Sequence, residues 1–84
     1  MNKENVYEIL SSVLGDDVEL VKNMDGNADL VSMGMDSIKF VSIVIALEEV
    51  FEIEYPDEFL LINHSNTLNK LISIVTEALK KKNT

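Results

Sequence analysis

The sequence predicts an all-α fold: a small bundle of three long helices plus one short helix, with a long first loop. Apolar residues recur at the helical spacing of three and four positions in three separate segments. The strict alternation of apolar and polar residues that marks a half-buried strand does not occur in the sequence. Because 84 residues is the length of one small domain, we expect residues 1–84 to form a single domain.

The first long helix is expected from Asn2 to Leu14, where positions 6, 9, 10, 13 and 14 are apolar. Asn2 suits the N-cap, and Gly15 suits the left-handed residue that ends a helix. Residues 15–36 have no sustained period and are rich in glycine, aspartate and asparagine, so we expect a long loop there. Its apolar anchors are expected to be Val18, Leu20, Val21, Leu30, Val31 and Met33.

The second long helix is expected from Ser37 to Glu52, and it is apolar on two sides. One side is a full core face, composed of Phe40, Ile43, Val44, Leu47, Val50 and Phe51. The opposite side carries a second apolar stripe and several acids, namely Ile38, Val41 and Ile45 with Glu48, Glu49 and Glu52. Such a helix is either sandwiched within a bundle or leaves this stripe exposed. The acids favour exposure, and an exposed apolar stripe with an acidic rim is typical of a surface that docks partner proteins.

The remainder of the chain is expected to form one short and one long helix. The segment 54–58 breaks the preceding helix, and Pro56 suits the first position of a short helix of one or two turns. Asn66 or Thr67 can cap the last long helix, and lysines 80–82 complement the negative end of its dipole. The apolar stripe of this helix is composed of Leu68, Leu71, Ile72, Val75, Ala78 and Leu79.

Composition excludes several classes of function. The net charge of −8, from fifteen acidic and seven basic residues, would repel the backbone of a nucleic acid. The sequence has no cysteine, and one histidine cannot make a zinc site, so we expect no disulfide and no metal centre. The acids near positions 25 to 29 lack the spacing of a calcium-binding loop. There is no apolar run of about 18 residues and no recognisable secretion signal, so we expect a cytoplasmic protein without membrane insertion.

Ser37 stands at the predicted start of the second long helix. A nucleophilic serine needs an adjacent base, and the only imidazole, His64, has no evident orienting partner, so the sequence does not predict an enzyme. A serine in this position is well placed to carry a phosphate ester, because backbone N–H groups and the helix dipole stabilise an anion there. The simpler interpretation of the residues alone is a plain N-cap serine.

The segment from Asp29 to Ile38 resembles the modification motif of the acyl and peptidyl carrier proteins. That motif has an acid, two apolar residues, any residue, Leu, Gly, any residue, Asp, Ser, and then Leu or Ile. The resemblance continues through residues 46–52 and through Tyr55–Glu58. It implies an acyl-carrier-protein-like fold over the whole chain.

The resemblance also implies a cofactor and a function. In this family a phosphopantetheinyl transferase moves 4′-phosphopantetheine from coenzyme A onto the motif serine, here Ser37, which follows the motif aspartate, Asp36. The arm, about 18–20 Å long when extended, ends in a thiol that carries an acyl or aminoacyl group as a thioester. The carrier itself performs no chemistry on this group.

The implied partners are enzymes that bind the carrier transiently. They are the phosphopantetheinyl transferase, an acyl- or aminoacyl-loading enzyme, and downstream synthase or transferase enzymes. We expect a monomer that docks by its exposed helix face, with charge steering the encounter. The expected partner-binding residues are Ile38, Lys39, Val41, Ser42, Ile45, Glu48, Glu49 and Glu52.

Departures from the family pattern bear on the pathway. Fatty acid carriers usually have acids where this chain has Lys39 and Ser42, and Met33 replaces the usual leucine. Leu30-Val31 is similar to the Phe-Phe pair of peptidyl carriers, which usually lack the Glu48-Glu49 pair. The mixture favours a freestanding carrier of a polyketide or nonribosomal peptide pathway. A fatty acid carrier, a D-alanyl carrier, and an unmodified acidic helical interaction module are the alternatives.

One group of predicted core residues bears on the cargo. A pocket for an acyl chain would form among Phe40, Val44, Leu47, Leu68, Leu71 and Ile72. The same side chains can form a closed core, which is the expected state when no chain is sequestered.

Overall fold

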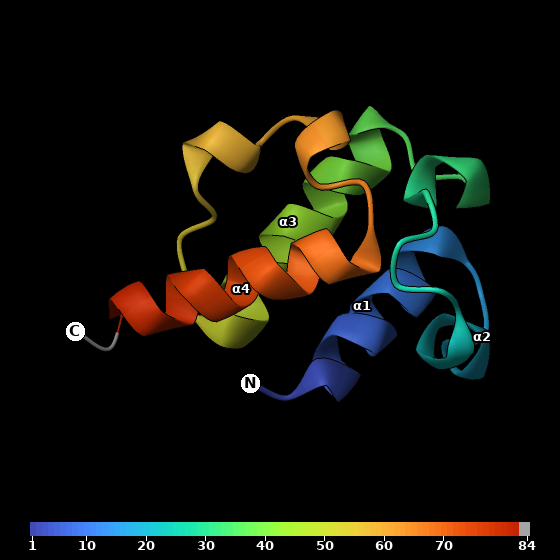
Figure 1. Ribbon diagram of the computed structural model, residues 1–84, viewed down its shortest axis with the longest axis horizontal. Helices are drawn as coiled ribbons and strands as arrows, with labels where there is room; N and C mark the ends of the chain where they lie inside the picture. Colours follow the sequence, from blue (N-terminus) through green and yellow to red (C-terminus); the bar gives the residue numbers. More distant parts are fainter. Residues whose placement is uncertain (83–84) are drawn as a thin grey trace.

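The structure is a computed structural model that describes residues 1–82, and it confirms the predicted all-α fold class (Figure 1). Over this range the chain forms helices and turns without a strand. Three helices are long, as expected, and one is short. The α-helices are α1 (Lys3–Leu14), α2 (Val18–Asn23), α3 (Ser37–Phe51) and α4 (Leu68–Lys82). The 3₁₀ turns are η1 (Leu30–Met33), η2 (Asp57–Phe59) and η3 (Ile62–His64).

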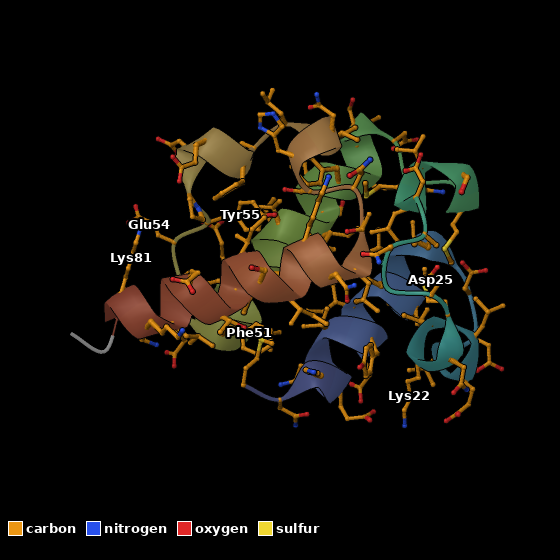
Figure 2. The ribbon with its side chains drawn as sticks, in the orientation of Figure 1. Lys22, Asp25, Phe51, Glu54, Tyr55 and Lys81 are labelled. Atoms are coloured by element: carbon orange, nitrogen blue, oxygen red, sulfur yellow. The ribbon has the colours of Figure 1, made fainter. Side chains whose placement is uncertain are left out.

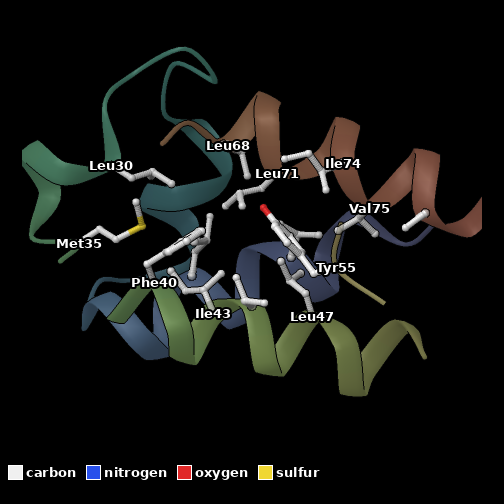
Figure 3. Close-up of a cluster of buried hydrophobic side chains, with 14 of the residues drawn as sticks. Leu30, Met35, Phe40, Ile43, Leu47, Tyr55, Leu68, Leu71, Ile74 and Val75 are labelled. Carbon is white, nitrogen blue, oxygen red and sulfur yellow. The ribbon is translucent and has the colours of Figure 1, made fainter. Parts of the chain in front are cut away.

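The long helices pack around one apolar core. Helix α1 packs against α3 and α2, and α3 also contacts α4. The close-up in Figure 3 shows core side chains that come from α3, from α4 and from the segments between the helices. None of the helices within residues 1–82 has the length and apolar character needed to cross a membrane.

The ends of the first and last long helices follow the expected capping chemistry. The Asn2 side-chain oxygen accepts a hydrogen bond from the Glu4 N–H at 3.0 Å, and Gly15 ends α1 with a φ of 74°. Of the two candidates before α4, Thr67 makes the capping bond, because its hydroxyl accepts from the Lys70 N–H at 3.1 Å. Short polar side chains therefore begin both helices and a glycine ends the first one, as the sequence predicts.

The expectation of a loop without structure over residues 15–36 is wrong in part. Helix α2 begins after Asp17, whose carboxylate accepts a hydrogen bond from the Glu19 N–H at 2.9 Å. Turn η1 begins in the same way after Asp29, which accepts from the Val31 N–H at 3.0 Å. Both elements are too short to show an apolar period, so they are held by their caps and by a few buried side chains. Of the expected anchors, Val21 and Leu30 are fully buried, Val18 and Met33 are half-buried, and Leu20 and Val31 are exposed.

The segment between α2 and η1 is tied to the start of α4. The Gly26 carbonyl accepts a hydrogen bond from the Asn69 N–H at 3.0 Å, and the Leu30 N–H donates to the Asn66 carbonyl at 2.8 Å. The Asn69 side chain lies so close to Gly26 that a Cβ there would collide with it. The same side chain donates to the Asn27 side-chain oxygen at 3.0 Å. A polar segment of low helical propensity is thus fixed by contacts that are distant in sequence.

The predicted short helix that begins with Pro56 at its first position is also wrong. Pro56 precedes η2, and the chain then forms two separate 3₁₀ turns without a side-chain cap on either one. Leu60 and Leu61 lie between these turns and are exposed. An uninterrupted apolar run cannot be buried on one side of so short a segment, so part of it faces solvent.

The predicted core face of α3 is correct except at one position. Phe40, Ile43, Val44 and Leu47 are buried, and Phe51 packs against the core. Val50 is 48% exposed, contrary to expectation. It lines a shallow groove between α1 and α3, where the two helices leave its side chain partly uncovered.

Tyr55 is bonded in the core to Ser65, the only buried polar residue among residues 1–82. Its hydroxyl donates to the Ser65 Oγ at 2.8 Å, and the Ser65 hydroxyl donates to the Phe59 carbonyl at 2.7 Å. Ser65 is fully buried, and burial raises the pKa of the Tyr55 hydroxyl, an effect that its hydrogen bond to Ser65 opposes. The neighbouring Glu54 is exposed, so the chain turns one side chain outward and the next inward (Figure 2).

Candidate functional site

The turn before α3 is fixed from both sides. Gly34 ends η1 with a φ of 103°, a conformation that favours glycine. Its N–H donates to the carbonyls of Leu30 and Val31. The next residue, Met35, is buried in the core, and its N–H donates to the Leu30 carbonyl at 3.1 Å. The backbone that leads into α3 is therefore held by a tight turn and by one buried side chain.

Asp36, and not Ser37, is the N-cap of α3. The Asp36 Oδ1 accepts a hydrogen bond from the Lys39 N–H at 2.8 Å, and the Asp36 carbonyl accepts from the Phe40 N–H at 2.8 Å. The simple interpretation of Ser37 as a capping serine is therefore wrong. Ser37 is the first residue of the helix and is exposed. Because Asp36 performs the capping, the Ser37 hydroxyl can be modified without loss of the cap.

The site suits a phosphate ester on Ser37. The first N–H groups of a helix have no acceptor within the helix, and the dipole favours negative charge at this end. A phosphodiester there would place its oxygens beside these donors, typically a contribution of about 0.3–1 kcal/mol for an exposed group. No group of three or more histidine, aspartate or glutamate side chains within residues 1–82 is arranged to hold a metal ion.

The apolar stripe of Ile38, Val41 and Ile45 is exposed, as predicted. The exposed fractions of these three side chains are 79%, 54% and 49%. The alternative of a sandwiched central helix is therefore wrong for this face of α3. Since exposed side chains of this size recur along one face directly after Ser37, the helix offers an apolar surface beside the candidate attachment point.

The polar residues expected on this face differ in their exposure and in their hydrogen bonds within the chain. Glu49 and Glu52 are exposed. Glu48 is half-buried, and its Oε2 accepts a hydrogen bond from the Tyr55 N–H at 3.0 Å. The Ser42 hydroxyl donates to the Ile38 carbonyl at 3.2 Å. The structure thus assigns Glu48 a bond within the chain that the sequence did not reveal, whereas the other two acids point to solvent.

Lys39 extends back toward the turn before the helix. Its ammonium nitrogen lies 3.8 Å from the point where a side chain on Gly34 would begin. The lysine is half-buried, so its methylene groups cover part of the turn while its charge stays at the surface. The start of α3 therefore carries a positive charge beside the turn at Gly34, three residues before the candidate attachment serine.

Sequence reasoning missed one exposed apolar pair. Leu60 and Leu61, with exposed fractions of 45% and 57%, lie between η2 and η3 and follow the exposed acids Asp57 and Glu58. The available signal was the continuous apolar run of residues 59–62, which is too short and too uniform to be buried on every side. His64 lies in the same segment, where its Nδ1 is 3.2 Å from the Glu58 carbonyl.

Comparison with known proteins identifies the family. The model of the phosphopantetheine attachment site matches residues 4–75. The chain is similar to the acyl carrier protein of Clostridium acetobutylicum, with 40% identity over 55 residues, which are 66% of this chain and 69% of that protein. It is also similar to the acyl carrier protein of Syntrophobacter fumaroxidans, with 38% identity over 53 residues. That match covers 63% of each chain, which is less than two thirds of the relative's length.

These matches show a class of protein that carries its reactive group on a prosthetic arm. The chain belongs to the family of phosphopantetheine-binding carrier proteins, and its cofactor is covalently bound 4′-phosphopantetheine. When bound, this group supplies a thiol that holds cargo as a thioester. Partner enzymes bind such a carrier transiently.

Removal of the Asp36 side chain tests the cap. We expect Asp36→Ala to lower the free energy of unfolding by about 1 kcal/mol, because the Lys39 N–H loses its acceptor. Asp36→Asn should lower the free energy of unfolding by less, since asparagine caps nearly as well and loses only the interaction of the charge with the helix dipole. Denaturant unfolding monitored by circular dichroism measures both. Equal losses in the two variants would contradict the assigned cap.

Proposed function

We propose that this chain carries acyl or aminoacyl intermediates as thioesters on a 4′-phosphopantetheine arm attached to Ser37. In this proposal residues 1–84 act as a single, monomeric carrier domain that passes its cargo between biosynthetic enzymes and performs no catalysis. The observation that supports it best is the exposed hydroxyl of Ser37 at the first residue of α3, where Asp36 already provides the cap. An arm on this hydroxyl extends into solvent and toward a partner.

The proposed attachment step uses coenzyme A and a phosphopantetheinyl transferase. The Ser37 Oγ forms a bond to the phosphorus next to pantetheine, and the pyrophosphate P–O bond to the adenosine part breaks. The hydroxyl proton leaves to solvent or to a base of the transferase, and adenosine 3′,5′-bisphosphate is the leaving group. The chain contributes an accessible hydroxyl and a helix end that favours the phosphodiester charge.

The proposed docking surface is the exposed face of α3. Ile38, Val41 and Ile45 supply a modest apolar patch, Glu49 supplies an acid on the same helix, and Glu52 supplies another directly after the helix ends. With a net charge of −8, the chain would be steered toward partners with basic patches, and salt would weaken this attraction. A small patch of this kind suits a carrier that must dissociate from each partner after the transfer.

For the pathway we propose polyketide or nonribosomal peptide synthesis over fatty acid synthesis or D-alanyl transfer. The support is the charge pattern at the start of α3, where Lys39 and Ser42 replace two acids that fatty acid carriers usually have. Lys39 adds a cation beside the turn at Gly34, and the Ser42 hydroxyl donates to the Ile38 carbonyl. A partner enzyme that binds this surface would need a different arrangement of charges from one that binds two carboxylates.

Intact mass tests the attachment directly. After incubation with coenzyme A and a promiscuous phosphopantetheinyl transferase, the protein should gain about 340 Da. Ser37→Ala should gain nothing, while the control variants Ser32→Ala and Ser42→Ala should gain the same mass as the wild type. No gain in the wild type would remove the carrier proposal and favour the unmodified interaction module, which binds a partner by its apolar stripe.

A charge within the apolar stripe tests the docking surface. We expect Val41→Asp to reduce the kcat/KM of the transferase for this carrier by about tenfold or more. The new carboxylate would lose its hydration in an apolar contact with the transferase, and this desolvation weakens binding. The matched control is Leu20→Asp, which places the same charge on an exposed leucine of α2. The rate of formation of the holo form, followed by mass, measures both. Equal reductions would show that α3 has no special role.

The mass of the protein purified from its native host tests the pathway. The proposed pathway predicts an aminoacyl, ketoacyl or otherwise polar cargo on the arm, released by hydroxylamine, which cleaves thioesters. A ladder of saturated chains that differ by two carbons would instead assign the chain to fatty acid synthesis. Alanine alone would assign it to D-alanyl transfer.

A further inference from the structure

We propose that Tyr55 keeps the core of this carrier closed, so that an acyl chain on the arm stays outside the helix bundle. The inference rests on the proposed function, because it concerns the cargo of an arm on Ser37. It assigns Tyr55 a role in cargo selection: the carrier suits short or polar acyl and aminoacyl groups that need no apolar shelter.

The first observation is the place of the Tyr55 ring. The ring is 3% exposed and lies between α3 and α4 (Figure 3). It packs on the Phe40 ring in a T-shaped arrangement, with the ring centroids 6.5 Å apart and the planes at 81°. The two aromatic rings thus occupy space between the helices, and they are the only aromatic side chains among the buried core residues within residues 1–82.

The second observation is that Tyr55 is held at both ends. Its hydroxyl donates to the Ser65 Oγ, and Ser65 in turn donates to the Phe59 carbonyl, so the ring is tied to the segment before α4. Its backbone N–H donates to the Glu48 carboxylate on α3. Ring and backbone are therefore fixed to two different parts of the bundle.

Transfer of an aliphatic cargo from water into an apolar environment is favourable. The candidate binding space in this fold lies between α3 and α4. Protein interiors are close-packed, so a chain can enter only if side chains there give way. If the Tyr55 ring moved, it would lose its contact with Phe40, and the fully buried Ser65 hydroxyl would lose a hydrogen-bond partner. An acyl chain offers no replacement for that partner, since its methylenes neither donate nor accept.

The surrounding residues support this assignment. The predicted pocket residues Phe40, Val44, Leu47, Leu68 and Leu71 are all buried in the same core cluster, and Ile72 packs against it. The closed alternative considered for these side chains is therefore the state that the structure shows. Tyr55, which was not among them, supplies the reason that this core resists entry.

The test compares octanoyl and holo forms. Wild type and Tyr55→Ala are loaded with octanoyl-coenzyme A or coenzyme A by a promiscuous transferase, and thermal unfolding is measured. In the wild type the two forms should unfold at the same temperature. In Tyr55→Ala the octanoyl form should be more stable by several degrees, because a chain that binds only the folded state stabilises it. The matched control, Tyr7→Ala, removes the other, half-buried tyrosine and should show no difference between the forms.

A second readout serves if Tyr55→Ala folds poorly. Hydroxylamine should cleave octanoyl and acetyl thioesters on the wild type at similar rates, whereas Tyr55→Leu should protect the octanoyl thioester several-fold. Stabilisation or protection of the octanoyl form in the wild type would overturn the inference, and so would a folded Tyr55→Ala without any octanoyl effect. Failure to load either protein would instead remove the proposed function, so the two failures are distinguishable.

Discussion

The hydrogen bond from the Lys39 N–H to the Asp36 carboxylate is the interaction on which the site depends. It starts α3 at a defined residue, and the Ser37 hydroxyl is not needed to cap the helix. Gly34, in a left-handed conformation, and the buried Met35 hold the backbone just before the cap. The proposed attachment of the arm to Ser37 would therefore leave the cap of α3 in place.

Helix α3 has two apolar faces, one buried in the core and one exposed. Its inner face packs on α1 and α4, and its outer face exposes Ile38, Val41 and Ile45. Glu48 lies between these faces and accepts a hydrogen bond from the Tyr55 N–H, so the helix also positions the segment to which we assign closure of the core. The proposed attachment point and the proposed docking surface therefore lie on one helix, which also contacts the Tyr55 segment, and a change at one of them can be tested against the others.

Much of the fold could be predicted because the long helices carry sustained apolar stripes and short polar caps. The first helix, the start of α3 and the exposed stripe all follow from such local patterns. Helix α2 could not be predicted in this way, since six residues show no period, and neither could the bond from Glu48 to Tyr55, which depends on tertiary packing. Val50 shows the same limit: the helical wheel places it on the core face, but only the neighbouring helix decides whether it is covered.

The most direct measurement of the central claim is the location of the arm by fragmentation of the holo protein in a tandem mass spectrometer. Ser32, Ser37 and Ser42 are evenly spaced around the start of α3, and all three are exposed. Exposure alone therefore does not select among them. If the cap at Asp36 presents Ser37 as described, the arm is found on Ser37 alone. An arm on Ser32 or Ser42, or one shared among the three, would contradict the account.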